Sequence, residues 1–396
     1  MKYRIDPKSG NKLSILGFGC MRLPRGLNVK IDIDKSEKLI MSAIDRGINY
    51  FDTGYVYAGS EQALGEILKR NAGAREKVYI ATKLPHGQCK TYEDFDRIFN
   101  TQLERLNTNY IDYYLMHNLS NVSDWDKIRK LGAEQWLSEK RASGRIKQVG
   151  FSFHGVQKEF LALLDEYDWD LCLVQHNYVN ENYQAGRVGI RKAHEKGMSV
   201  MIMEPLLGGK LATGLPKKAV ALLKDANGAL TPAAWALRWL WNQDEPTVVL
   251  SGMNGMDQLD DNISAAENAG AGMMSEMETA AIARVVEIFK ESYKIPCTEC
   301  NYCMPCPQSV NIPGSFAAYN LRHSSGFIAG MSSYMTSTGA TNTERNFSGR
   351  NCVQCGNCEK QCPQHIEIIK SLDQVTKRME PFWFRAAMGL FGRIMK

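Results

Sequence analysis

Two short cysteine runs near the C-terminal end constrain the fold of this chain more than any other feature. The first run comprises Cys297, Cys300, Cys303 and Cys306, and the second comprises Cys352, Cys355, Cys358 and Cys362. Together they hold eight of the chain's eleven cysteines, and each run ends in Cys-Pro. Four thiolates at this spacing before a proline are typical of bacterial 4Fe-4S proteins. We therefore expect two 4Fe-4S clusters in this part of the chain.

The last cysteine of such a run usually ligates the other cluster of the pair. This rule predicts one cluster on Cys297, Cys300, Cys303 and Cys362, and a second on Cys352, Cys355, Cys358 and Cys306. The first run has two residues before its last cysteine, where the usual run has three, so the clusters of Cys306 and Cys362 stay open. A zinc ribbon fits this pattern less well, and spacings this tight rarely suit disulfides.

Length and composition bound the remaining possibilities. A barrel of roughly 250 residues plus a small module would account for the 396 residues. No apolar stretch is long enough to cross a bilayer, and the net charge of +5 gives no reason to expect nucleic acid as a partner. The polar start has no signal-peptide core, and cluster thiols need a reducing compartment, so we expect a cytoplasmic protein.

Strand-like and helical patterns alternate along the first two thirds of the chain. The expected strands are 15–19, 49–52, 78–82, 111–116, 148–151, 171–175, 199–203 and 247–250. Amphipathic helical patterns lie between them, including a single expected helix over 125–142. Eight buried strands that alternate with helices predict an α/β fold, a (β/α)8 TIM barrel rather than an open sheet. A small, mainly helical, ferredoxin-like iron–sulfur domain follows.

The predicted domains are a barrel over 1–275, a helical linker with the dicluster domain over 276–376, and a basic aromatic tail over 377–396. Residues 312–325 are expected to be helical, and 326–349 a loop or weak helix. The tail carries five Lys and Arg against Glu380 alone, with several large apolar residues. Such a tail suits a membrane surface, an acidic partner such as a ferredoxin, or a terminal helix packed on the body.

Motifs at the predicted strand ends resemble the aldo-keto reductase family. These motifs are 52–61 with Leu64 and Gly65, 81–83, 114–117, 150–152, 174–178 and 203–206. They fall at the carboxyl ends of strands, where barrel enzymes build their active sites. The cysteine runs match the subgroup of this family that has a C-terminal dicluster domain. The resemblance implies an NAD(P)H-dependent oxidoreductase that acts on a carbonyl substrate.

The resemblance also implies a catalytic tetrad, which consists of Asp52, Tyr57, Lys83 and His117. Reduction of a carbonyl by hydride leaves a developing alkoxide, for which Tyr57 would supply the proton. Because the pKa of free tyrosine is near ~10, a neighbouring Lys83 cation would lower it, and Asp52 would orient Lys83. His117 would polarise the carbonyl.

The same resemblance implies a nucleotide site. Its expected residues are Ser152, Gln175, Asn177, Leu206, Gly208, Lys210, Gly252, Gln258 and Asn262. Tyr178 or Phe153 would stack near the nicotinamide ring. Gly252 and Gln258 stand where NADPH-specific relatives carry basic residues. Without those basic residues, we expect NADH to be at least as good a cofactor as NADPH.

Nicotinamide transfers two electrons together, whereas each 4Fe-4S cluster accepts one. Three hypotheses follow. The barrel reduces an aldehyde, ketone or quinone while the clusters serve electron transfer or docking. Alternatively, the clusters pass electrons from an external ferredoxin to the barrel, with a possible flavin. In the third hypothesis, a non-catalytic protein senses redox state and nucleotide occupancy.

Overall fold

The computed structural model describes residues 1–26, 30–338 and 347–381, and its contacts divide the chain into two compact units. The first unit comprises Met1–Leu206 and Ala233–Met274, and the second comprises Leu207–Pro232 and Ser275–Lys396. The sequence boundaries placed Leu207–Pro232 in the barrel, whereas this segment packs within the second unit. The part of the predicted tail beyond Pro381 lies outside the described residues.

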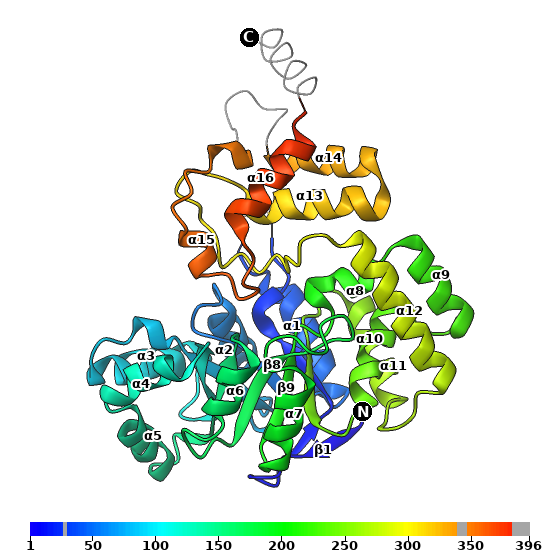
Figure 1. The fold of residues 1–396 in the computed structure, drawn as a ribbon. Coiled ribbons are helices and arrows are strands. Elements are labelled where there is room, and N and C mark those ends of the chain that lie inside the picture. The colour runs from blue at the N-terminus through cyan, green and yellow to red at the C-terminus, as the bar shows by residue number, and fades with distance from the viewer. Residues whose placement is uncertain (27–29, 339–346, 382–396) are drawn as a thin grey trace. The chain divides into compact units, whose positions relative to one another are not determined.

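The first unit is a closed barrel of eight parallel strands, as the sequence predicted (Figure 1). Its strands are β3 (Leu16–Gly19), β4 (Tyr50–Asp52), β5 (Tyr79–Leu84), β6 (Ile111–Leu119), β7 (Ile146–Phe153), β8 (Leu171–Gln175), β9 (Ser199–Met203) and β10 (Pro246–Ser251). β10 pairs with both β9 and β3, which closes the barrel. A short antiparallel pair that the sequence did not predict, β1 (Tyr3–Ile5) and β2 (Lys12–Ser14), precedes it.

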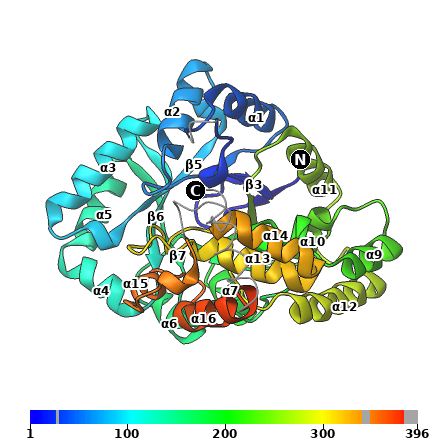
Figure 2. The same ribbon diagram turned by 90° about the horizontal axis from the view of Figure 1, so that it is seen from above.

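Helices surround these strands, as the view from above shows (Figure 2). They are α1 (Ile33–Asp45), α2 (Ser60–Arg70), α3 (Tyr92–Leu106), α4 (Val122–Lys130), α5 (Ala133–Ala142), α6 (Gln157–Leu163), α7 (Gly186–Glu195), α10 (Pro232–Trp241) and α11 (Met256–Glu267). The single helix expected over 125–142 is two helices. Gly132 breaks it with a φ of 96°, a left-handed conformation that glycine adopts readily.

The second unit is helical. Its helices are α8 (Lys210–Thr213), α9 (Lys217–Ala226), α12 (Glu276–Ser292), α13 (Ile312–Ser325), α14 (Phe327–Thr338), α15 (Asn357–Lys360) and α16 (Ile368–Met379). α9 packs against α12, which explains why Leu207–Pro232 groups with this unit. α13 and α14 form a hairpin. α13 lies where a helix was expected, and α14 lies within 326–349, where a loop or weak helix was expected. Buried Val310, Phe316, Tyr334, Leu372 and Val375 belong to the core of the unit.

None of the helices within the described ranges has the length and apolar character needed to cross a bilayer.

Candidate active site and cluster-binding residues

A buried ion pair lies at the carboxyl ends of two neighbouring strands. Asp52 ends β4 and Lys83 lies near the end of β5, and the parallel pairing of these strands brings the two side chains to one edge of the barrel. Lys83 Nζ lies 2.6 Å from Asp52 Oδ1 and donates to the Thr53 carbonyl oxygen at 2.5 Å. Burial raises the pKa of Asp52, and the Lys83 cation opposes that shift. Asp52 therefore holds the Lys83 ammonium in place at the carboxyl end of the barrel.

Tyr57 and His117 lie beside this pair. The Lys83 ammonium is 4.7 Å from the centre of the Tyr57 ring, and the Tyr57 and His117 rings meet edge to face with centroids 5.9 Å apart. Gly54 keeps room for the phenol, because an added Cβ there would lie 3.2 Å from the Tyr57 ring. The structure thus brings all four residues of the expected tetrad together, although Tyr57 follows β4 and His117 belongs to β6.

The surroundings of His117 keep its imidazole neutral. Burial lowers the pKa of His117 well below the ordinary value, and the positive charge on Lys83 and the nearby His154 and His86 lower it further. A neutral imidazole can donate one hydrogen bond to a substrate oxygen without carrying a permanent charge.

A buried polar network that the sequence did not predict holds the backbone of Lys83 from the side of helix α3. Gln102 on α3 donates to the backbone oxygen of Lys83 at 3.1 Å and to Glu61 at 2.9 Å. Glu61 also accepts from Thr82 at 2.6 Å and from Arg105 at 3.0 Å. Gln102 is fully buried on the core face of α3, between apolar positions. A single glutamine on the apolar face of an amphipathic helix is the sequence feature that could have indicated this network.

Ser152 and Gln175 end two further barrel strands, at the expected nicotinamide side. Gln175 is fully buried, and neither its amide oxygen nor its amide nitrogen has a hydrogen-bond partner among the described residues. An unsatisfied buried amide is costly, so this side chain is suited to pair with the amide of a ligand. Ser152 Oγ accepts from the Asn118 N–H at 2.7 Å. The residues present therefore fit a carboxamide-bearing group.

The neighbouring predicted residues divide into two kinds. Asn177 orders its own loop, since its side-chain oxygen accepts from the N–H groups of Val179 and Asn180. Phe153 packs edge to face with Phe151 and Phe160, in the aromatic core rather than at the amide pocket. Because Ser152 and Phe153 point to opposite faces of β7, this packing of Phe153 on Phe160 of α6 favours Tyr178 of the two expected aromatic residues. Tyr178 remains the candidate for stacking.

At the expected adenosine end, Gly252, Gln258 and Asn262 lie around the end of β10. Asn262 donates to Ser251 Oγ at 2.9 Å, and Gln258 accepts from the Asn254 N–H at 3.0 Å. An added Cβ at Gly252 would lie 3.8 Å from the side chain of Arg22, which comes from the far end of the sequence. A basic side chain from a distant part of the sequence therefore adjoins this end.

The segment after β9 is held by the first cysteine run. Leu206 ends the barrel part of this segment. Gly208 has a φ of 68°, and an added Cβ would lie 2.4 Å from the carbonyl oxygen of Thr298. Lys210 forms an ion pair with Glu299, the residue before Cys300. Within the second unit, Gly208 and Lys210 thus pack on the loop that carries the predicted cluster ligands.

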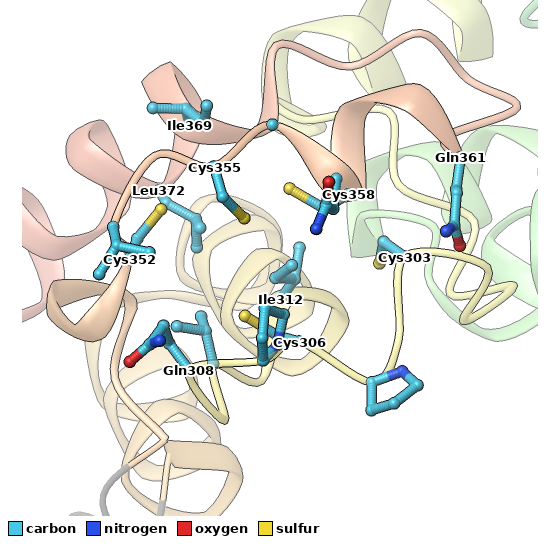
Figure 3. Close-up of a pocket in the computed structure, with 16 residues that line it drawn as sticks. Cys303, Cys306, Gln308, Ile312, Cys352, Cys355, Cys358, Gln361, Ile369 and Leu372 are labelled. Carbon is cyan, nitrogen blue, oxygen red and sulfur yellow. The ribbon is translucent and has the colours of Figure 1, made fainter.

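Five cysteines from both runs line one pocket in the second unit. They are Cys303 and Cys306 from the first run and Cys352, Cys355 and Cys358 from the second, as Figure 3 shows. Apolar side chains such as Ile312 and Leu372 complete the lining. The pocket holds the four cysteines predicted for one cluster together with Cys303, which was predicted for the other, so the assignment of each cysteine to a cluster stays a prediction. The residues therefore fit a group held by several thiolates.

The four cysteines predicted for the other cluster, Cys297, Cys300, Cys303 and Cys362, are near one another as well. Burial, together with the neighbouring thiols of Cys300 and Cys362, raises the pKa of Cys303 to about 12. The pKa of Cys297 is about 12 for the same reasons, with Cys300 and Cys303 as its neighbours. Such thiols stay protonated until a cation replaces the proton. Among the described residues, these thiols do not already converge on one point as a site for a single metal ion.

Comparison with known proteins identifies the family. Residues 15–286 match the sequence model of the Aldo/keto reductase family, and this match spans more than half of the chain. The chain belongs to the aldo/keto reductase family. Residues 296–367 match the 4Fe-4S dicluster domain, so the second unit of this aldo/keto reductase carries the predicted type of cluster domain.

Relatives agree with this assignment. Probable aldo-keto reductase 1 of Glycine max is 27% identical over 293 residues, which cover 65% of this chain and 82% of that protein. A probable voltage-gated potassium channel subunit beta of Arabidopsis thaliana is 21% identical over 67% of this chain and 92% of its own. The crystal structure of an aldo-keto reductase of Klebsiella pneumoniae in complex with NADPH has a TM-score of 0.60 and 20% identity, and covers 72% of this chain and 95% of that one. At that identity the likeness shows the fold.

Replacement of Lys210 by methionine tests the contact with the cysteine run. Without its ion pair to Glu299, the loop that carries Cys297 and Cys300 is held less firmly, so Lys210→Met should lose its 4Fe-4S absorbance faster when a chelator is added. The control is Lys217→Met, which changes an exposed lysine on α9. Equal rates in the wild type and both variants would contradict the role given to the pair.

The pH dependence of turnover tests the neutral imidazole. Because the pKa of His117 lies well below its ordinary value of 6.5, kcat/KM for a carbonyl substrate should show no ionisation of this group between pH 6 and about 7. The measurement is the pH profile of the wild type beside that of His117→Gln. A bend near the ordinary histidine pKa that disappears in His117→Gln would show that His117 titrates there.

Proposed function

We propose that this aldo/keto reductase reduces the carbonyl of an aldehyde, ketone or quinone with NADPH or NADH. The observation that carries the proposal is the buried Lys83–Asp52 pair, which lies beside the Tyr57 phenol and a neutral His117. The bound nicotinamide would supply a hydride to the carbonyl carbon. The unsatisfied amide of Gln175 and the hydroxyl of Ser152 would hold its carboxamide.

The residues of the chain then handle the proton. As the carbonyl oxygen gains negative charge, His117 donates a hydrogen bond to it and Tyr57 delivers the proton. The Lys83 cation favours the phenolate that remains, which makes Tyr57 a better acid than free tyrosine. Asp52 does not reach the substrate in this mechanism. It holds Lys83 in place and offsets its charge when no phenolate is present.

The nucleotide preference rests on the adenosine end of the site. The proximity of Arg22 to Gly252 supports NADPH, because a 2′-phosphate needs a guanidinium or ammonium partner. Gln258 and Asn262 would order the loop that receives the adenosine. Leu206, in the barrel unit, is proposed to approach the pyrophosphate. NADH remains the alternative, since Gln258 carries no charge.

For the second unit we propose two 4Fe-4S clusters. Cys306, Cys352, Cys355 and Cys358 would hold one, which their common pocket supports. Cys297, Cys300, Cys303 and Cys362 would hold the other, which the mutual proximity of these thiols supports. Such clusters transfer single electrons. The proposed barrel lies within 1–275, from which Leu207–Pro232 is excluded because it packs with the second unit. The linker and dicluster domain span 276–376 and the tail 377–396, in a cytoplasmic protein.

A ferredoxin-linked reductase is the second candidate function. Cys355 is solvent-exposed, so a cluster held there would be accessible to an external one-electron carrier. Electrons would then pass singly, and a flavin in the barrel would be needed to combine them. The resemblance to a potassium channel subunit beta supports a third candidate, a regulatory protein that binds nucleotide without turnover.

Replacement of Tyr57 by phenylalanine separates these functions. Without its acid, carbonyl reduction with NADPH should fall by about 10²–10⁴-fold in kcat, while the affinity for NADPH stays unchanged because the ring is kept. The control is Tyr55→Phe on the same loop, whose ring packs on Arg105 rather than at the tetrad. Carbonyl reduction that survives intact in Tyr57→Phe would refute the proposed mechanism, and wild-type protein that binds NADPH without any turnover would favour the regulatory role.

A further inference from the structure

Two large apolar side chains are exposed at the turn of the α13–α14 hairpin. Phe327 is 46% exposed and Ile328 is 83% exposed, the highest exposure among the large apolar residues of the described chain. They begin α14 directly after Gly326. Single exposed apolar residues are common on protein surfaces and need no explanation. An adjacent pair among several cations is a more specific feature.

Basic side chains gather around this pair. The Arg322 guanidinium lies 4.9 Å from the centre of the Phe327 ring and donates to the backbone oxygen of Arg378 at 2.8 Å. His323 packs edge to face on Tyr319. The Lys294 N–H donates to the side-chain oxygen of Asn320 on α13 at 3.0 Å, and burial and then the positive charges of Lys294, Arg322 and Arg378 lower the pKa of His323. We name this set the hairpin patch: Lys294, Arg322, His323, Phe327, Ile328 and Arg378.

The acidic side chains of the surrounding elements do little to offset this charge. Glu380, just after α16, is buried. It accepts hydrogen bonds from Tyr334 and Ser348 and forms an ion pair with Arg350. Asp373 on α16 pairs with Lys377, one turn along the same helix. Glu291 on α12 is exposed and is the acidic residue nearest in sequence to Lys294. The patch therefore keeps a net positive charge.

The chain leaves the described structure beside this patch. α16 ends at Met379, next to Arg378, and lies by the α13–α14 hairpin in both views (Figures 1 and 2). The following residues, 382–396, carry Arg385, Arg393 and Lys396 and no Asp or Glu. They also include Phe382, Trp383, Phe384 and Phe391. Basic residues interleaved with aromatic ones are typical of segments that lie in a membrane interface.

We propose that the hairpin patch binds a membrane surface that contains anionic lipids, with Phe327 and Ile328 entering the headgroup layer and the cations contacting lipid phosphates. The charge is complementary to such a surface, and the apolar pair lies at the tip of a hairpin, where it can enter a soft interface. An acidic protein is the other partner that would match the cations, and the test below distinguishes it from a membrane. This inference goes beyond the proposed carbonyl reductase, whose chemistry it does not require.

Vesicle sedimentation with the full-length, cluster-loaded protein tests this binding. The protein should sediment with phosphatidylcholine vesicles that contain phosphatidylglycerol, should sediment much less with phosphatidylcholine alone, and should be released by salt. Ile328→Asp and Arg378→Glu should each lower the bound fraction several-fold. The matched controls are Met277→Asp, an exposed apolar residue of α12, and Lys217→Glu, an exposed lysine of α9, which should bind like the wild type.

Three results would overturn the proposal. Equal binding of the wild type and the two patch variants would show that the patch makes no lipid contact. Binding that disappears when the chain is cut after Pro381, but survives in Ile328→Asp and Arg378→Glu, would assign the membrane contact to residues 382–396 alone. Patch-dependent binding to a ferredoxin without vesicle binding would identify an acidic protein as the partner. Carbonyl reduction by Ile328→Asp, measured in parallel, keeps these outcomes separate from those for the reductase.

Discussion

The Lys83–Asp52 ion pair is the interaction on which the candidate active site depends. Lys83 is 1% exposed, and burial of a lone ammonium in this way would be prohibitive. Asp52 at 2.6 Å and the carbonyl oxygen of Thr53 make it tolerable. Removal of either partner from such a pair costs about 3–5 kcal/mol, because the other charge is left buried and unpaired. A pair of this kind is weak evidence for stability, and the proposed mechanism uses its position beside Tyr57 and His117.

The closed barrel supplies the geometry that this pair needs. β4 and β5 are adjacent and parallel, so Asp52 and Lys83 reach the same end of the barrel, and β6 brings His117 to that end as well. The Gln102–Glu61 network then fixes the backbone around Lys83 from the helix side. In the second unit, folding has a parallel task, which is to bring cysteines about 50 residues apart in sequence to a common pocket.

Much of this could be predicted from the sequence, because the signals were local. The eight strands follow from short apolar runs, and the family motifs mark the residues at their ends. What could not be predicted arises from contacts between distant segments. The Lys210–Glu299 pair joins residues that no periodicity relates, and Arg22 approaches Gly252 only because β10 closes the barrel on β3. The choice between Tyr178 and Phe153 also depends on such a contact, because Phe153 packs on Phe160 of α6, which favours Tyr178.

The fate of the hydride is the most direct test of the reductase mechanism. NADPH deuterated at both C4 positions would be mixed with the anaerobic cluster-loaded protein and an aldehyde, while the cluster absorbance is followed and the alcohol is analysed by mass spectrometry. We predict one deuterium on the alcohol carbon and no change in cluster absorbance during turnover. An alcohol without deuterium, formed while the clusters bleach and recover, would contradict direct hydride transfer and would show that electrons pass singly through the iron.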